Sequence, residues 1–300
     1  MKNLFRMISL LCISFLAAMP GSAEAKVKVI ASITPLKSLT ESVGGDLVEV
    51  ESIGRGTEDP HFVEVRPSFM ISIAKAKLYI SVGMSLDIWA KPLIENSRNT
   101  DIVIINASKG IHILGVPTER VSALLGDVHP EGNPHYWLDP YNIPIVIRNI
   151  VTGLAQVDPA NSAVYQKNGR DFLDKLKKAD ADWQARLKPY SKTKVVTFHQ
   201  SWDYFAEHFK LEVRGQVEPK PGIPPSGAHT DDIIQLVKRE KIPLIFMEPY
   251  YNDAHPKLIA EKTGAKLLKL PQLCGGVPKT ETYLELMEYN VSAVERALKK

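Results

Sequence analysis

Short apolar segments alternate with amphipathic stretches through the first half of the chain. Four segments have the length of a strand and are apolar or alternate between apolar and polar positions: residues 27–32, 48–53, 78–82 and 101–106. Helical patterns lie between them, one from Pro35-Leu36 to near Gly44-Gly45 and another at 68–75. Strands that alternate with helices in short units indicate a parallel sheet with helices on both faces.

The middle of the chain carries one long helical pattern. It runs from residue 160 to residue 187, and Asp158-Pro159 supplies a cap and a first-turn proline. Its apolar positions recur at helical spacing: Val164, Phe172, Leu173, Leu176, Ala179 and Trp183. A helix of this length spans about 42 Å. We expect a rigid connector between two lobes, and a stiff connector predicts small lobe movements when a ligand binds.

Strand and helix patterns alternate again after this connector. Strand patterns lie at 194–198, 244–247 and 266–270, and helical patterns lie at 202–209, 231–239 and 282–299. We therefore predict an α/β fold with two Rossmann-like lobes, whose mostly parallel sheets are joined by one long connecting α-helix. The predicted boundaries are 26–158 for the N-terminal lobe, 159–188 for the connecting helix and 189–300 for the C-terminal lobe.

The N-terminus has the order of features that is typical of a secretory signal peptide. Lys2 and Arg6 precede an apolar stretch at 7–19, and Ala23-Glu24-Ala25 supplies a small-x-small cleavage pattern. The apolar stretch is shorter than the ~20 residues of a membrane-spanning helix. We predict that residues 1–25 are a signal peptide and that the mature chain is a soluble periplasmic protein.

Cysteine usage argues against a lipid anchor and against disulfides. Cys12 lies inside the predicted signal peptide, and Ser9-Leu10-Leu11 before it lacks the small residue expected before a lipid-modified cysteine. Cys274 is then the single cysteine of the mature chain, so no internal disulfide is expected. The formal net charge is +3, without a dense stripe of lysine and arginine, which does not favour binding to nucleic acid or to a membrane surface.

Three of the eight histidines lie in loops or directly after a predicted strand. His61 follows Asp59-Pro60, His135 follows Pro134, and His199 follows the strand pattern at 194–198. Ligand sites in open α/β sheets collect outside the carboxyl ends of strands. Three neutral imidazoles and one further donor form a tetrahedral zinc site. The three histidines form no local motif, so their spacing alone leaves surface and capping roles open.

The segments around these histidines resemble the zinc- and manganese-binding receptors of ABC transporters. The matching residues are Glu58-Asp59-Pro60-His61, Glu64, Arg66-Pro67-Ser68, 74–83, Pro134-His135-Tyr136-Trp137-Leu138-Asp139-Pro140, 165–168, His199, Trp202, Tyr204-Phe205, Leu211 and Phe246-Met247-Glu248-Pro249. The resemblance covers nearly all of the mature chain. It implies a metal site between two lobes, with His61 and His135 from the N-terminal lobe and His199 from the C-terminal lobe. It also implies a monomeric receptor, not an enzyme, that delivers its ion to a membrane permease.

The residue at position 199 bears on the choice of metal. Manganese receptors of the family usually carry glutamate where this chain has His199. Nitrogen-rich sites favour zinc over manganese. The resemblance therefore implies Zn²⁺ as the transported ligand, with Mn²⁺ or Fe²⁺ as the alternatives.

The chain departs from the family pattern at the fourth metal ligand. Many members have an aspartate after the strand that matches 266–270, whereas this chain has Leu270-Pro271-Gln272-Leu273-Cys274. Water is the first candidate, because three protein ligands and an open position are a known zinc arrangement. Glu248 and then Glu58 are the next candidates, and Cys274 is a further one, although a buried small residue explains it more simply.

Other functions stay open at this point. A zinc-dependent hydrolase would use the same histidines with Glu248 or Glu58 as a general base, but the sequence has no HExxH or GxSxG motif. A receptor for an iron chelate or cobalamin would share the fold without the three histidine segments. Nothing in the sequence discriminates a cell-adhesion role. His129 is a weaker candidate for an auxiliary metal ligand, and we expect surface or capping roles for His112, His208, His229 and His255.

Overall fold

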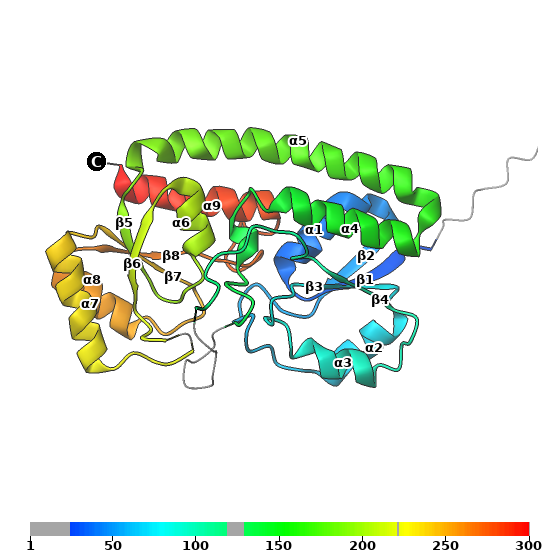
Figure 1. Cartoon of the computed structure of the whole chain (residues 1–300), viewed down its shortest axis with the longest axis horizontal. Coiled ribbons are helices and arrows are strands. Elements are labelled where there is room, and N and C mark those ends of the chain that lie inside the picture. Colours follow the sequence, from blue (N-terminus) through cyan, green and yellow to red (C-terminus); the bar gives the residue numbers. More distant parts are fainter. Residues whose placement is uncertain (1–24, 119–128, 221, 300) are drawn as a thin grey trace, which may run out of the picture.

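The computed structural model describes residues 25–118, 129–220 and 222–299, and its first sheet lies in the N-terminal half. This sheet has four parallel strands in the order β2-β1-β3-β4 (Figure 1). The strands are β1 (Val27–Ala31), β2 (Val48–Ser52), β3 (Leu78–Ser81) and β4 (Val103–Asn106). Val29 and Ala31 of β1 join one apolar cluster and Ile30 joins another, because successive side chains point to opposite faces. Both faces of β1 are therefore buried from Val29 to Ala31, which explains the apolar run at these positions.

Helices cover both faces of this sheet. One face packs against α1 (Thr34–Gly44) and α4 (Ile143–Val157), and the other against α2 (Pro67–Lys75) and α3 (Ala90–Asn96) (Figure 1). The sequence patterns predicted α1 and α2 but did not assign α3 and α4. The α4 segment is apolar on a broad face, since Ile143, Val146, Ile147, Ile150 and Leu154 are all buried.

The C-terminal half repeats this layered arrangement with a second parallel sheet. The strand order is β6-β5-β7-β8, formed by β5 (Lys194–Thr197), β6 (Glu212–Gln216), β7 (Leu244–Met247) and β8 (Lys266–Lys269). Its helices are α6 (Asp203–Phe209), α7 (Gly227–Glu240), α8 (Ala254–Thr263) and α9 (Tyr283–Leu298). The α/β fold with two parallel sheets is thus confirmed, although β6 and α8 were not assigned from the sequence.

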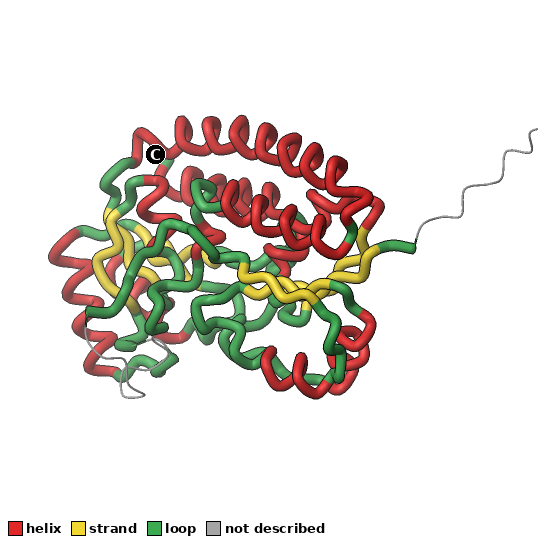
Figure 2. The backbone as a smooth tube through the Cα atoms, turned by 45° about the vertical axis from the view of Figure 1, so that its right-hand side comes forward, coloured by secondary structure: helices red, strands yellow, loops and turns green. Residues whose placement is uncertain are grey.

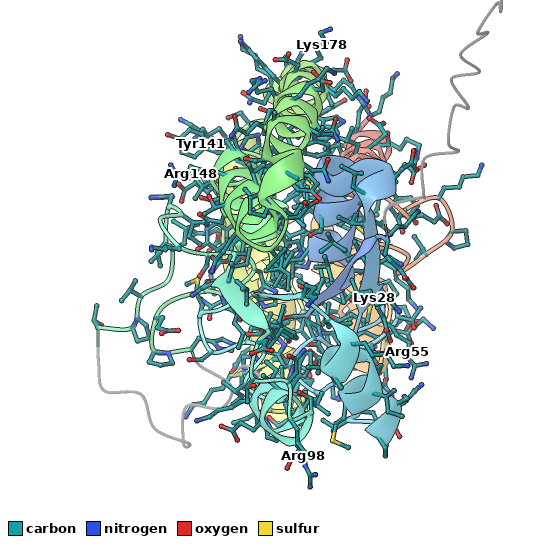
Figure 3. The ribbon with its side chains drawn as sticks, turned by 90° about the vertical axis from the view of Figure 1, so that its right-hand side faces the viewer. Lys28, Arg55, Arg98, Tyr141, Arg148 and Lys178 are labelled. Atoms are coloured by element: carbon teal, nitrogen blue, oxygen red, sulfur yellow. The ribbon has the colours of Figure 1, made fainter. Side chains whose placement is uncertain are left out.

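One long helix lies along both halves of the molecule. It is α5 (Ser162–Leu187), which is preceded by a 3₁₀ turn at Pro159–Asn161, and Figure 1 shows it spanning from α4 to the end of α9. Its buried positions include Phe172, Leu176 and Trp183, which join the same apolar cluster as residues of both sheets. Many of its charged side chains are exposed, as that of Lys178 is in Figure 3.

Loops of both halves lie between the two sheets, as Figure 2 shows. These loops follow the carboxyl ends of strands, which is where the sequence predicted a ligand site. None of the described helices is both long and apolar enough to cross a membrane bilayer. Residues 1–24 of the predicted signal peptide lie outside the described residues.

Candidate metal centre

The structure brings His61, His135 and His199 together. One potential ligand atom from each side chain lies within 4.8 Å of the other two. The ring centroids are 5.1 Å apart for His61 and His135, 5.0 Å for His61 and His199, and 5.5 Å for His135 and His199. A tetrahedral zinc ion with Zn–N bonds of ~2.1 Å would hold imidazole centroids roughly 5 Å apart. The three rings therefore have the spacing of three corners of a tetrahedral site.

Each histidine comes from a different loop. His61 lies in the loop between β2 and α2, His135 begins the 3₁₀ turn Tyr136–Leu138, and His199 follows β5. The loop before His135 is tied to the segment between β5 and α6, because Asn133 Nδ2 donates to the Gln200 carbonyl at 2.6 Å. Residues from both sheets thus define the geometry of the site, and hydrogen bonds between the loops hold it.

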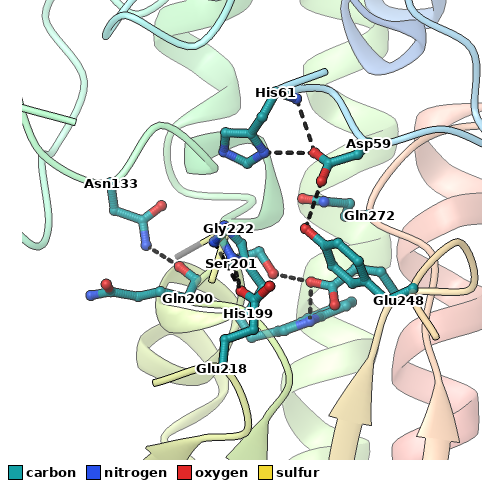
Figure 4. Close-up of polar contacts among 12 residues, drawn as sticks. Asp59, His61, Asn133, His199, Gln200, Ser201, Glu218, Gly222, Glu248 and Gln272 are labelled. Carbon is teal, nitrogen blue, oxygen red and sulfur yellow. Dashed lines mark hydrogen bonds and ion pairs between the residues drawn. The ribbon is translucent and has the colours of Figure 1, made fainter. Parts of the chain in front are cut away.

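A carboxylate orients the ring of His61. The distance between His61 Nδ1 and Asp59 Oδ1 is 2.7 Å (Figure 4). Tyr251 of the other half donates its hydroxyl to Asp59 Oδ2 at 2.9 Å. Burial alone would raise the pKa of Asp59, but the hydrogen bonds from His61 and Tyr251 and the charge of His61 lower it. With Nδ1 facing Asp59, the Nε2 atom of His61 is the one available to a metal ion.

A second carboxylate orients His199 in the same way. His199 Nδ1 and Glu218 Oε2 are 2.8 Å apart, and both side chains are buried. Burial would lower the pKa of His199, but the hydrogen bond to Glu218 and the charges of Glu248, Glu218 and Asp59 raise it. This pairing again leaves Nε2 for a metal ion, and a histidine that bonds a carboxylate through its other nitrogen is a common metal ligand.

His135 differs from the other two because neither ring nitrogen has a hydrogen-bond partner of regular geometry among the described residues. Burial, followed by the charges of His61, His199 and His129, holds its pKa well below the usual range. A buried imidazole that is neutral and has unsatisfied nitrogens is suited to coordinate a cation. The donor set therefore fits a metal ion that prefers nitrogen ligands.

A fourth imidazole lies at the edge of the centre. The ring centroid of His129 is 5.3 Å from that of His61, and its charge acts on His135. The sequence marks His129 as a weak candidate for an auxiliary ligand, and the structure places its ring beside that of His61. The residues before it, Asp127 and Val128, lie outside the described residues.

The three side chains considered for the fourth ligand have different surroundings. Glu248 is fully buried, its Oε1 atom accepts hydrogen bonds from Ser201 and Trp202, and burial raises its pKa to about 7. Glu58 accepts a hydrogen bond from the Arg55 backbone at 2.8 Å. Cys274 is buried in the apolar core. Among the described residues, none of these three side chains joins the group of ligand atoms that lie within 4.8 Å of one another, which comes from the three histidines.

Sequence reasoning missed the residues that orient the ligands. Asp59 lies inside the matched Glu58–His61 segment but was not assigned a role, and no local pattern marked Glu218 or Tyr251. Their common feature is a position after a strand or within a loop at the same edge as the histidines. The three-dimensional arrangement of the loops was needed to find them.

Comparisons with known proteins agree with this arrangement. Residues 29–297 match a family described as the periplasmic component A of zinc-uptake complexes, ZnuA. The iron-binding protein YfeA of Yersinia pestis is 27% identical over 285 residues, which cover 92% of this chain and 88% of that protein. The manganese ABC transporter substrate-binding lipoprotein PsaA of Streptococcus anginosus is 24% identical over 308 residues, with 96% of each chain covered.

A solved structure has the same fold. The crystal structure of a ZnuA superposes with a TM-score of 0.80 at 25% identity, covering 91% of this chain and 99% of that chain. The two-lobed arrangement and the resemblance to metal-binding receptors, both predicted from the sequence, are confirmed.

Proposed function

The chain belongs to the family of the periplasmic component A of zinc-uptake complexes, and we propose that Zn²⁺ is the ion that it binds. As a receptor of this kind it carries a divalent metal ion to the membrane permease of an ABC transporter. The relatives are named for manganese and for iron as well as for zinc, so the metal is argued from the ligands of this chain.

The observation that supports zinc is the set of three converging imidazoles. Nitrogen donors favour zinc over manganese, which prefers oxygen. Two of the three rings, His61 and His199, have Nδ1 against a carboxylate, so Nε2 is the atom that would bind the ion. Such second contacts fix the ring orientation and increase the basicity of the ligand nitrogen.

The charges around the centre also suit a divalent cation. Three neutral imidazoles leave the two positive charges of Zn²⁺ uncompensated, and a buried charge is costly unless it is paired. Asp59 and Glu218 together supply two negative charges, and each carboxylate contacts a histidine ligand rather than the ion itself. The site therefore balances the charge of the ion without giving it a carboxylate ligand from these two residues.

Binding takes place outside the cytoplasm under this proposal. Residues 1–25 would direct export and be removed, and the mature receptor would stay in the periplasm without a lipid anchor. Its relative PsaA is named a lipoprotein, so this proposal would make the chain differ from PsaA in having no lipid anchor. Fractionation of cells and mass measurement of the exported chain test this part, because a lipid adds mass to the N-terminal residue and retains the protein in the membrane.

Metal competition on the mature chain tests the proposed ion. Protein comprising residues 26–300 is stripped with a chelator and titrated with Zn²⁺, Mn²⁺ and, without oxygen, Fe²⁺, followed by elemental analysis. We expect one zinc per chain and displacement of bound manganese by zinc. Manganese that binds more tightly than zinc would contradict the proposed ion.

Single substitutions test the proposed ligands. We expect His61→Ala, His135→Ala and His199→Ala each to weaken zinc binding by at least about tenfold, because one of three protein donors is lost. His112→Ala is the matched control, since His112 is exposed and pairs with Glu207 at 3.3 Å. Zinc affinity unchanged in all three variants would rule out this site.

A further inference from the structure

Gln272 is a buried polar residue that the proposed function above does not use. It lies three residues after β8, in the segment where the sequence has no carboxylate, and its exposed fraction is 0%. A fully buried carboxamide requires partners for both its oxygen and its nitrogen. The contacts of these two atoms differ.

The backbone around Gln272 is held firmly. Its carbonyl accepts a hydrogen bond from Trp137 Nε1 at 2.7 Å, and the carbonyl of Pro271 accepts one from Asn290 Nδ2 at 2.8 Å. The ring of Trp137 lies 5.2 Å from the ring of His135, measured between centroids. These contacts join the segment after β8 to the loop that carries His135.

The carboxamide nitrogen is satisfied and the oxygen is not. Nε2 of Gln272 donates to the hydroxyl of Tyr250, whereas Oε1 is buried without a hydrogen-bond partner among the described residues. An unsatisfied buried acceptor costs about 1–3 kcal/mol. Coordination of a cation would remove this cost.

The carboxamide also lies next to a proposed ligand. Gln272 is close enough to the His135 imidazole to raise its pKa against the effect of burial, although the contact does not have regular hydrogen-bond geometry. In the close-up of Figure 4, the carboxamide lies between the His61–Asp59 pair and Glu248.

The loop that carries His61 packs against the same segment. A Cβ atom on Gly56 would lie 2.2 Å from the carbonyl oxygen of Cys274 and 2.5 Å from the carbonyl carbon of Gly275. Only a residue without a side chain allows the backbones to approach this closely. The segment that begins at Gln272 is thus in contact with the loops of two of the three histidines.

The charge balance favours a neutral donor at this position. Zn²⁺ contributes two positive charges, and Asp59 and Glu218 contribute two negative charges. A carboxylate ligand would leave a net negative charge in a buried centre, next to the carboxyl group of Glu248, whereas an amide oxygen leaves the balance unchanged.

We propose that the carboxamide oxygen of Gln272 is the fourth ligand of the metal ion, completing a site of three nitrogens and one neutral oxygen. The inference rests on the receptor function proposed above and adds a residue that determines metal specificity. A neutral oxygen contributes less to manganese binding than a carboxylate does, so this ligand set keeps the preference for zinc.

Two substitutions of similar size test the role of this oxygen. Gln272→Met removes the oxygen, and we expect zinc affinity to fall by about tenfold or more, the range for disrupted metal-site contacts. Gln272→Glu adds a charge and a harder donor, and we expect the ratio of manganese to zinc affinity to rise by about tenfold. The melting temperature of the metal-free Gln272→Met protein measures the separate loss of the hydrogen bond from Nε2 to Tyr250. The increase in melting temperature on adding zinc should shrink.

The zinc-loaded crystal structure of the unaltered protein provides the direct test. We expect Gln272 Oε1 at about 2.1 Å from the ion. A water molecule or a Glu248 oxygen in that position, or zinc affinity of Gln272→Met within twofold of the unaltered protein, would overturn the inference. If Gln272→Met does not fold, the loaded structure decides alone. Failure of the unaltered protein to bind any divalent metal would instead reject the receptor function itself.

Discussion

His61 and His199 each have Nδ1 against a carboxylate, which leaves Nε2 to bind an ion at the shared centre. The two pairs come from different halves of the chain, and Tyr251 adds a hydrogen bond from the C-terminal half to Asp59 of the N-terminal half. At the scale of single residues, the centre is therefore pre-organised by groups that would not touch the ion. Their removal should change affinity without removing a ligand.

Neutralising either carboxylate tests this expectation. We predict that Asp59→Asn and Glu218→Gln each lower zinc affinity by about 10- to 100-fold, because ring orientation and charge compensation are both lost. Competition with a chromophoric chelator measures the change. Glu64→Gln is the control, since the Glu64 side chain is 76% exposed and pairs with the neighbouring Arg66 at 3.3 Å. Equal affinities for all three variants would show that the carboxylates have no role in metal binding.

At the scale of elements, His208 joins three separate parts of the chain. It lies on α6, its Nδ1 is 2.7 Å from Asp139 in the loop after His135, and its Nε2 is 2.6 Å from Asp180 on α5. The sequence predicts a surface or capping role for His208, but its side chain is largely buried. Burial would lower the pKa of His208, yet the hydrogen bonds and charges of the two aspartates raise it to about 9.

The raised pKa predicts a loss of stability at alkaline pH. The stabilisation is fully present below the unfolded-state pKa of about 6.5, and it is lost as pH rises toward 9, where folded His208 releases its proton. We expect this histidine to contribute on the order of 2 kcal/mol to the free energy of unfolding at pH 6.

Denaturant unfolding at several pH values measures this contribution. His208→Gln should be less stable than the unaltered protein at pH 6, and the difference should narrow by pH 9.5. His112→Gln, at an exposed position, controls for the loss of an ordinary histidine. A difference that stays constant across this range would show that the proton of His208 does not supply the stabilisation.

At the scale of the whole molecule, the two halves share one apolar core. The cluster that contains Val29 of β1 also contains Phe246 of β7 and Trp183 of α5. The ends of α5 are further held to the helices on either side, since Asn168 Nδ2 donates to the Val43 carbonyl at 3.0 Å and Trp183 Nε1 donates to Glu288 at 2.8 Å. A large rotation between the halves would break these contacts.

We therefore predict that metal loading changes the angle between the two sheets by only a few degrees. A stiff helix that is packed on both halves resists the hinge closure that flexible linkers permit. Small-angle scattering and crystal structures of the metal-free and zinc-loaded forms measure the movement. A rotation of tens of degrees would contradict the prediction, as would a loaded form with separated α5 and α9.

Local patterns in the sequence predict most of the strands and helices of the fold. Strand segments that are buried on both faces are continuous apolar runs, and the 3.6-residue period marks a long helix such as α5. Short or irregular elements were not predicted from the sequence, because tertiary packing outweighs local preference in these segments. β6 contains Gly215, which weakens a strand pattern, and α3 has only seven residues.

The sequence by itself determined the alternation of strands and helices in two halves around one long helix, the resemblance to metal-binding receptors and the three histidines proposed as ligands. Only the tertiary structure decided which groups surround those histidines: Asp59, Glu218 and Tyr251 as orienting partners, Gln272 beside His135, and His208 buried between two aspartates. The physical reason is that local periodicity depends on residues a few positions apart. Contacts such as Trp137 with Gln272, which are 135 positions apart, exist only after two sheets have packed around one core.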